Sequence, residues 1–106
     1  MVYTERQALT HALAKQPCMI LFLKDFMEHP GSTARESAER LGVEYDDRDR
    51  HARLHLNRPA FRPYVSIAKV PRRCPYCGKA MKPVNGYTII PEREEELRRV
   101  IAYVED

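Results

Sequence analysis

Apolar residues repeat with the period of an α-helix in the first half of the chain and follow extended patterns in much of the second half. One helix is predicted from Thr4 to about Lys15, because its apolar residues fall on a single helical face. Thr4, with a glutamine three residues later, has the pattern of a capping box at its start. A second helix is predicted from Cys18 to about Glu28. Pro17 separates the two, because proline disfavours the helical conformation of the preceding residue.

Two further helices are predicted before residue 60. The third covers Ala34 to Leu41. Ser32 or Thr33 can cap it, and a glutamate lies three residues after Thr33. Gly42 can adopt the left-handed conformation that ends it. The fourth covers about Arg48 to Leu56 and ends at the segment 57–59, which contains a proline.

The period then changes to that of strands, over Tyr64–Val70 and Gly86–Ile90. Pro91 can occupy the first turn of a last helix, Glu92 to Glu105. The elements predict an α+β fold in a single domain, residues 1–106, with helices in 4–57, a two-stranded hairpin in 64–90 and a C-terminal helix in 91–106.

The last helix carries an apolar stripe with two possible partners. A second copy of the chain is one partner, which would make this helix a dimerisation element. The other is the first predicted helix, through Ala8, Leu9 and Leu13. The stripe consists of Leu97, Val100, Ile101 and Val104.

Composition narrows the class of protein. The chain has 106 residues, 43% hydrophobic and 31% charged, which suits one small folded domain. Its longest nearly apolar run, Cys18–Leu23, is far too short to span a membrane, and no secretory signal pattern is present. Three cysteines do not indicate a disulfide framework, so a cytoplasmic protein is expected.

Charge is strongly segregated along the chain. Residues 48–82 carry ten Lys or Arg and one Asp, whereas residues 1–47 carry five basic and eight acidic side chains. Residues 83–106 carry three basic and six acidic ones. A basic centre between acidic ends is the pattern expected of a chain that binds phosphates, although a solvated basic surface gives the same pattern.

The segment 30–43 resembles the first half of a helix-turn-helix. It places the small residue Ala38 where two helices would cross, followed by Leu41 and Gly42 at the turn. Helices, helix-turn-helix and hairpin, in this order, resemble a winged helix-turn-helix domain. With the cysteine segment 70–78, the chain is similar to a small archaeal group of winged-helix proteins whose wing carries a rubredoxin-like zinc ribbon. The first cysteine pair of such a ribbon is missing near residues 57–62.

The resemblance implies that double-stranded DNA is the partner and that the fourth helix is the recognition helix, lying in the major groove. The residues it implies there are Arg48, Arg50, His51, Arg53 and Asn57, with Arg58 directly after them. On the wing it implies a second basic surface formed by Arg62, Lys69, Arg72, Arg73, Lys79 and Lys82.

Cys74 and Cys77 form a C-x-x-C pair with several possible roles. A glycine directly after the second cysteine suits half of a zinc site, which needs two more ligands. His51 and His55, an i, i+4 pair, could supply them, as could a second chain or water. A disulfide or free thiols are further alternatives. A redox role would require a helix after the pair, and no helical period follows it.

These observations predict a DNA-binding transcriptional regulator that forms homodimers, with zinc as a candidate cofactor. The alternatives are a protein-interaction module of transcription or modification machinery and a thiol oxidoreductase using Cys74 and Cys77. No acid–base pair, phosphate-binding loop or nucleophile constellation is evident, so no enzyme is predicted.

Overall fold

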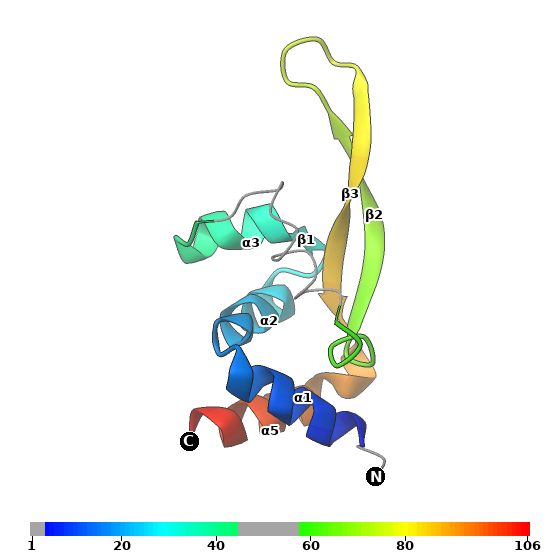
Figure 1. Ribbon diagram of the computed structural model, residues 1–106. Coiled ribbons are helices and arrows are strands. Elements are labelled where there is room, and N and C mark those ends of the chain that lie inside the picture. Colours follow the sequence, from blue (N-terminus) through cyan, green and yellow to red (C-terminus); the bar gives the residue numbers. More distant parts are fainter. Residues whose placement is uncertain (1–3, 45–57) are drawn as a thin grey trace.

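The computed structural model describes residues 4–44 and 58–106 of the chain. They form a mixed α+β structure in which helices surround the base of a long antiparallel hairpin (Figure 1). The elements are α1 (Glu5–Lys15), α2 (Cys18–Glu28), β1 (Ser32–Thr33), α3 (Ala34–Leu41), β2 (Val65–Arg73), β3 (Ala80–Ile89), the 3₁₀ turn η1 (Pro91–Arg93) and α5 (Glu94–Glu105).

Local side-chain chemistry sets the helix ends. Thr4 and Thr33 both form the predicted capping boxes, in which the threonine oxygen accepts from the backbone N–H three residues on. Gly42 ends α3 with a φ of 71°, the left-handed conformation that glycine adopts without strain. The last helix was predicted from Glu92. It instead starts with η1, and α5 follows from Glu94.

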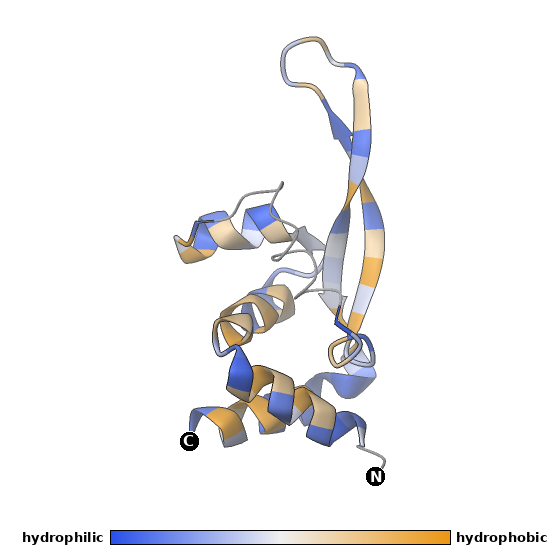
Figure 2. Ribbon diagram, in the orientation of Figure 1, coloured by the Kyte–Doolittle hydropathy of each residue, from blue (hydrophilic) through white to orange (hydrophobic). Residues whose placement is uncertain are grey.

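The core lies between α1, α2, α5 and the lower half of the hairpin. Phe26, Phe61 and Tyr64 are its largest fully buried side chains, and the Phe26 ring stacks on Tyr87 of β3 at 5.1 Å between centroids. Apolar residues are concentrated on α1, α2 and α5, whereas hydrophilic residues recur along the part of the hairpin that extends away from these helices (Figure 2). Burial therefore holds only the lower part of the hairpin to the body.

The apolar stripe of the last helix is part of this core. Leu97, Val100 and Ile101 are at most 3% exposed, Val104 is partly buried, and α5 packs along α1. Packing onto the first helix, the second of the two alternatives, is therefore confirmed. The two alternatives are compatible with one another, and dimerisation through this helix stays a prediction.

The sheet is antiparallel with the order β1-β3-β2. Both hairpin strands are longer than predicted: β2 continues to Arg73 and β3 begins at Ala80. The short strand β1 was not predicted. It pairs Ser32 with Tyr87 and Thr33 with Gly86, and so joins the hairpin to the start of α3.

A buried polar cluster fixes α3 against α2 and β1. The Asp25 carboxylate accepts a hydrogen bond from Ser37 Oγ at 2.6 Å and from Arg40 at 2.7 Å (Nη2) and 3.0 Å (Nε). Arg40 also donates to Ser32 Oγ. The hydrogen bonds from Arg40 hold the pKa of Asp25 below its usual value of 3.8, against the opposing effect of burial.

Gly86 lies at the closest approach between the hairpin and the chain before β1. A Cβ at this position would stand 2.7 Å from the backbone oxygen of Gly31 and 2.7 Å from Val70 Cγ2. Gly31 is also bound to β3, because its N–H donates to the Tyr87 oxygen at 3.0 Å. A methyl group therefore cannot enter without moving one backbone segment away from the other.

We expect Gly86→Ala to lower the free energy of unfolding by about 1–3 kcal/mol, the usual cost of overpacking a closely packed site. Urea denaturation followed by circular dichroism measures this change. Ala68→Ser, on the strand residue opposite Gly86, is the control, because Ala68 is exposed and its extra hydroxyl can be solvated. Unchanged stability in Gly86→Ala would mean that β1 does not approach β3 this closely.

Candidate functional site

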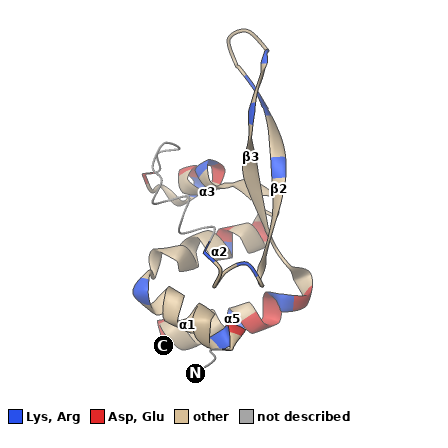
Figure 3. Ribbon diagram, turned by 45° about the vertical axis from the view of Figure 1, so that its right-hand side comes forward, with Lys and Arg blue, Asp and Glu red and all other residues tan. Residues whose placement is uncertain are grey.

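The hairpin, together with the segment that leads into it, is the most basic part of the described structure. Between Arg58 and Pro91 the chain has seven Lys or Arg and no Asp or Glu. The hairpin extends away from the helices, along the longest dimension of a molecule of 51 × 27 × 25 Å. Figure 3 shows basic residues along both hairpin strands, whereas the acidic residues lie on the helices.

Cross-strand contacts hold the basic side chains of this hairpin. Lys69 Nζ donates to Asn85 Oδ1 at 2.9 Å, and Arg72 Nε donates to the backbone oxygen of Lys82 at 3.2 Å. The remaining basic residues of the upper hairpin, Arg73, Lys79 and Lys82, are exposed to solvent. No residue of the hairpin can neutralise these charges internally, since it contains no carboxylate.

A break in the strand pairing divides the hairpin into two halves. The register shifts between Val70 and Arg72, and Pro71 stands at the shift. Pro83 lies on the opposing strand, and neither proline has an N–H to donate to the ladder. Irregularities of this kind bend and twist a strand locally. The half that carries Arg72, Arg73 and the cysteines is therefore separated from the half that packs on the core.

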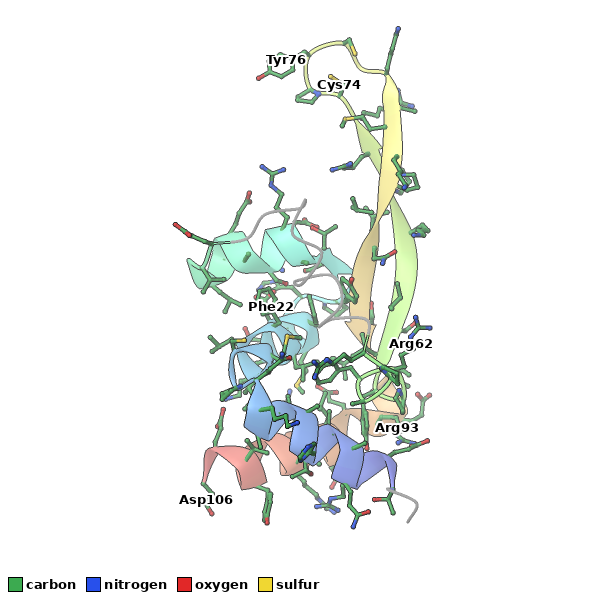
Figure 4. All side chains as sticks on the ribbon, viewed as in Figure 1. Phe22, Arg62, Cys74, Tyr76, Arg93 and Asp106 are labelled. Atoms are coloured by element: carbon green, nitrogen blue, oxygen red, sulfur yellow. The ribbon has the colours of Figure 1, made fainter. Side chains whose placement is uncertain are left out.

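Two residues of the predicted DNA-binding set, Arg62 of the wing and Arg58 after the fourth helix, lie away from this surface. Arg62 stands at the base of the hairpin, at the opposite end from Cys74 (Figure 4). Arg58 lines a surface cavity of about 300 Å³ next to α1, together with His11 and Lys15. Arg62 is therefore separated from the tip by the length of the hairpin, and its contact with DNA stays a prediction.

Cys74 and Cys77 occupy the turn at the tip of the hairpin. The turn is closed by two backbone hydrogen bonds of 2.9 Å, from Cys74 N–H to the Lys79 oxygen and from Gly78 N–H to the Cys74 oxygen. Gly78 has a φ of 71°, so glycine is needed at this point. Both thiols are free, and β3 begins at Ala80 without an intervening helix. The helix N-terminus that favours a redox role is thus not found here.

The sulfur of Cys74 is surrounded by hydrogen-bond donors. The backbone N–H groups of Tyr76 and Cys77 and the thiol of Cys77 all donate to it, and together they lower its pKa from the usual 9.0. This arrangement stabilises a thiolate and places the second sulfur beside it. Two cysteine side chains in one turn are half of the ligand set of a structural zinc site.

Several predicted residues fall outside the described parts of the chain. They include the predicted recognition helix, Arg48 to Leu56, so its DNA contacts stay a prediction, and so does the completion of a metal site by histidines. The residues concerned are Arg48, Arg50, His51, Arg53, His55 and Asn57.

Sequence reasoning missed the pairing of Asp25 with Arg40 and the exposure of Tyr76, whose side chain is 97% exposed at the tip. The signal for the first was a carboxylate within the apolar stretch of α2.

Across residues 4–44 and 58–106, no helix is long and apolar enough to cross a membrane. Comparison with protein-family models, curated proteins and solved structures finds no match to this chain. Function must therefore be argued from the chemistry of the hairpin.

Proposed function

We propose that this chain is a winged-helix DNA-binding protein, a regulator of transcription whose basic hairpin contacts backbone phosphates. The observation that carries the proposal is the projecting hairpin, which has five Lys or Arg between Val65 and Ile89 and no acidic residue. Positive side chains that no carboxylate neutralises attract a polyanion, and their release of condensed counterions favours binding to DNA.

The arrangement of elements supports the same proposal. α3 has the small buried residue Ala38 and the left-handed Gly42 that the first helix of a helix-turn-helix requires. It begins directly after β1, which pairs with the hairpin. A DNA duplex lying against α3 would therefore have the hairpin beside it, where Lys69 and Arg72 can reach the phosphates.

Titration of a labelled DNA duplex at several salt concentrations tests the proposal. If four of the five hairpin cations contact phosphates, the logarithm of the association constant should fall against the logarithm of salt concentration with a slope of about −3.6. Contacts from the segment 45–57 would make the slope steeper. Failure to bind duplex DNA at about 50 mM salt would contradict the proposal and would favour a protein partner.

A further inference from the structure

The tip of the hairpin provides two metal ligands in a preformed arrangement. Cys74 and Cys77 are held three residues apart in a turn that two backbone hydrogen bonds of 2.9 Å close, from Cys74 N–H to the Lys79 oxygen and from Gly78 N–H to the Cys74 oxygen. Both thiols are free, so the closed turn offers two zinc ligands on one short segment of the chain.

The described part of the chain does not supply the other two ligands. Structural zinc is bound by four side chains in a tetrahedron. In residues 4–44 and 58–106, no group of three or more His, Cys, Asp or Glu side chains is placed to hold a metal. The remaining described cysteine, Cys18, lies at the start of α2 in the body, whereas Cys74 lies at the far end of the hairpin (Figure 4).

The tip is also open to a second molecule. Cys77 and Lys79 are exposed, and Tyr76 between the cysteines is 97% exposed. The hairpin carries the turn away from the helices, so another copy can approach it without meeting the body of the first (Figure 1). Two identical turns related by a twofold axis would present four sulfurs to one ion.

We propose that Zn²⁺ joins two copies of the chain at their hairpin tips through Cys74 and Cys77 of each copy. On binding, each protonated thiol loses its proton to solvent, and four thiolates around one Zn²⁺ leave a net charge of −2. Arg73 directly precedes Cys74 and Lys79 lies two residues after Cys77, so these cations of both copies offset that charge. Without the ion the two basic tips repel each other, so association depends on the metal. This inference is independent of DNA binding.

The test is the zinc content and solution mass of the reduced protein, with Zn²⁺ alone as the probe. We expect one zinc per two chains and a mass twice the 12.4 kDa of one chain. A chelator should return the mass to 12.4 kDa, and added Zn²⁺ should restore the dimer. Higher salt should strengthen the zinc-bound dimer, because it screens the repulsion between the basic tips.

Variants identify the ligands. Cys74→Ser and Cys77→Ser should each abolish zinc binding and dimerisation. With a chelator present, each should keep the melting temperature of the wild type, because the tip is remote from the core. Cys18→Ser is the matched control and should keep both. The double variant His51→Ala/His55→Ala should also keep both. Zinc loss in that variant, one zinc per monomer, a dimer that survives chelation, or no zinc uptake by the reduced chain would each overturn the proposal.

Discussion

Replacing Asp25 with alanine is expected to lower the free energy of unfolding by about 2–3 kcal/mol, which for a chain of this length lowers Tm by roughly 10–20 °C. The variant leaves the fully buried hydroxyl of Ser37 without its acceptor and removes the ionic partner of Arg40. About a third of the Arg40 side chain is exposed (34%), so water replaces part of what the guanidinium loses. Thermal and urea unfolding followed by circular dichroism measure the change.

Glu39→Ala is the matched control for this prediction. It also removes one carboxylate, but the ion pair of Glu39 with Arg35 is 3.7 Å long and solvent-exposed on both sides. Such surface pairs contribute little, so the expected change is within about 0.5 kcal/mol. Equal destabilisation by the two substitutions would show that the cluster around Asp25 does not fix α3.

The contribution of Asp25 should also depend on pH. Its pKa in the folded chain lies below the usual value of 3.8, so folding favours the ionised form. The stabilisation is fully present above the unfolded pKa and is lost as the pH falls through the folded pKa. The difference in stability between the wild type and Asp25→Ala should therefore be constant above about pH 5 and should shrink in more acidic solution.

The sequence predicted the elements whose signals are local. Both capping boxes and the glycine end of α3 depend on side chains within four residues of one another, and all three were found at the predicted positions. The apolar stripe of α5 was also recognised, but the sequence left open whether α1 or a second copy covers it. The packing of α5 on α1 shows that the chain itself covers most of the stripe.

The features that were missed depend on contacts between distant segments. The strand β1 has two residues, and it exists because β3 offers Tyr87 and Gly86 as partners. The upper hairpin has exposed side chains and two prolines, so it lacks the alternating pattern that burial imposes on a strand. Arg62 was grouped with the tip because it is close in sequence, although the extended hairpin carries the tip away from it (Figure 4).

Neutralising two basic residues of the hairpin should have the largest effect on DNA binding. We expect the double variant Arg73→Gln/Lys82→Gln to bind a DNA duplex roughly 60-fold more weakly at 0.1 M salt, because two phosphate contacts no longer release counterions. By the same relation the loss should shrink to roughly 9-fold at 0.3 M salt. Both side chains are exposed, so the fold should be unaffected.

A matched control removes the same amount of positive charge from α5 instead of the hairpin. Arg98→Gln/Arg99→Gln also removes two positive charges, but from α5, where they pair with Glu94 and Glu95 at 3.0 and 2.7 Å. These arginines are already neutralised and do not lie on the hairpin. The expected loss of affinity is at most about twofold, because screening limits long-range effects at this salt concentration.

The salt dependence of DNA binding by the wild type and these two double variants tests the central claim most directly. The hairpin variant should show a slope less steep than that of the wild type by about 1.8, the contribution of two phosphate contacts. The α5 variant should keep the wild-type slope. If both variants change the slope equally, or neither changes it, the hairpin does not contact the phosphates and the account of this chain as a hairpin-dependent DNA-binding protein is wrong.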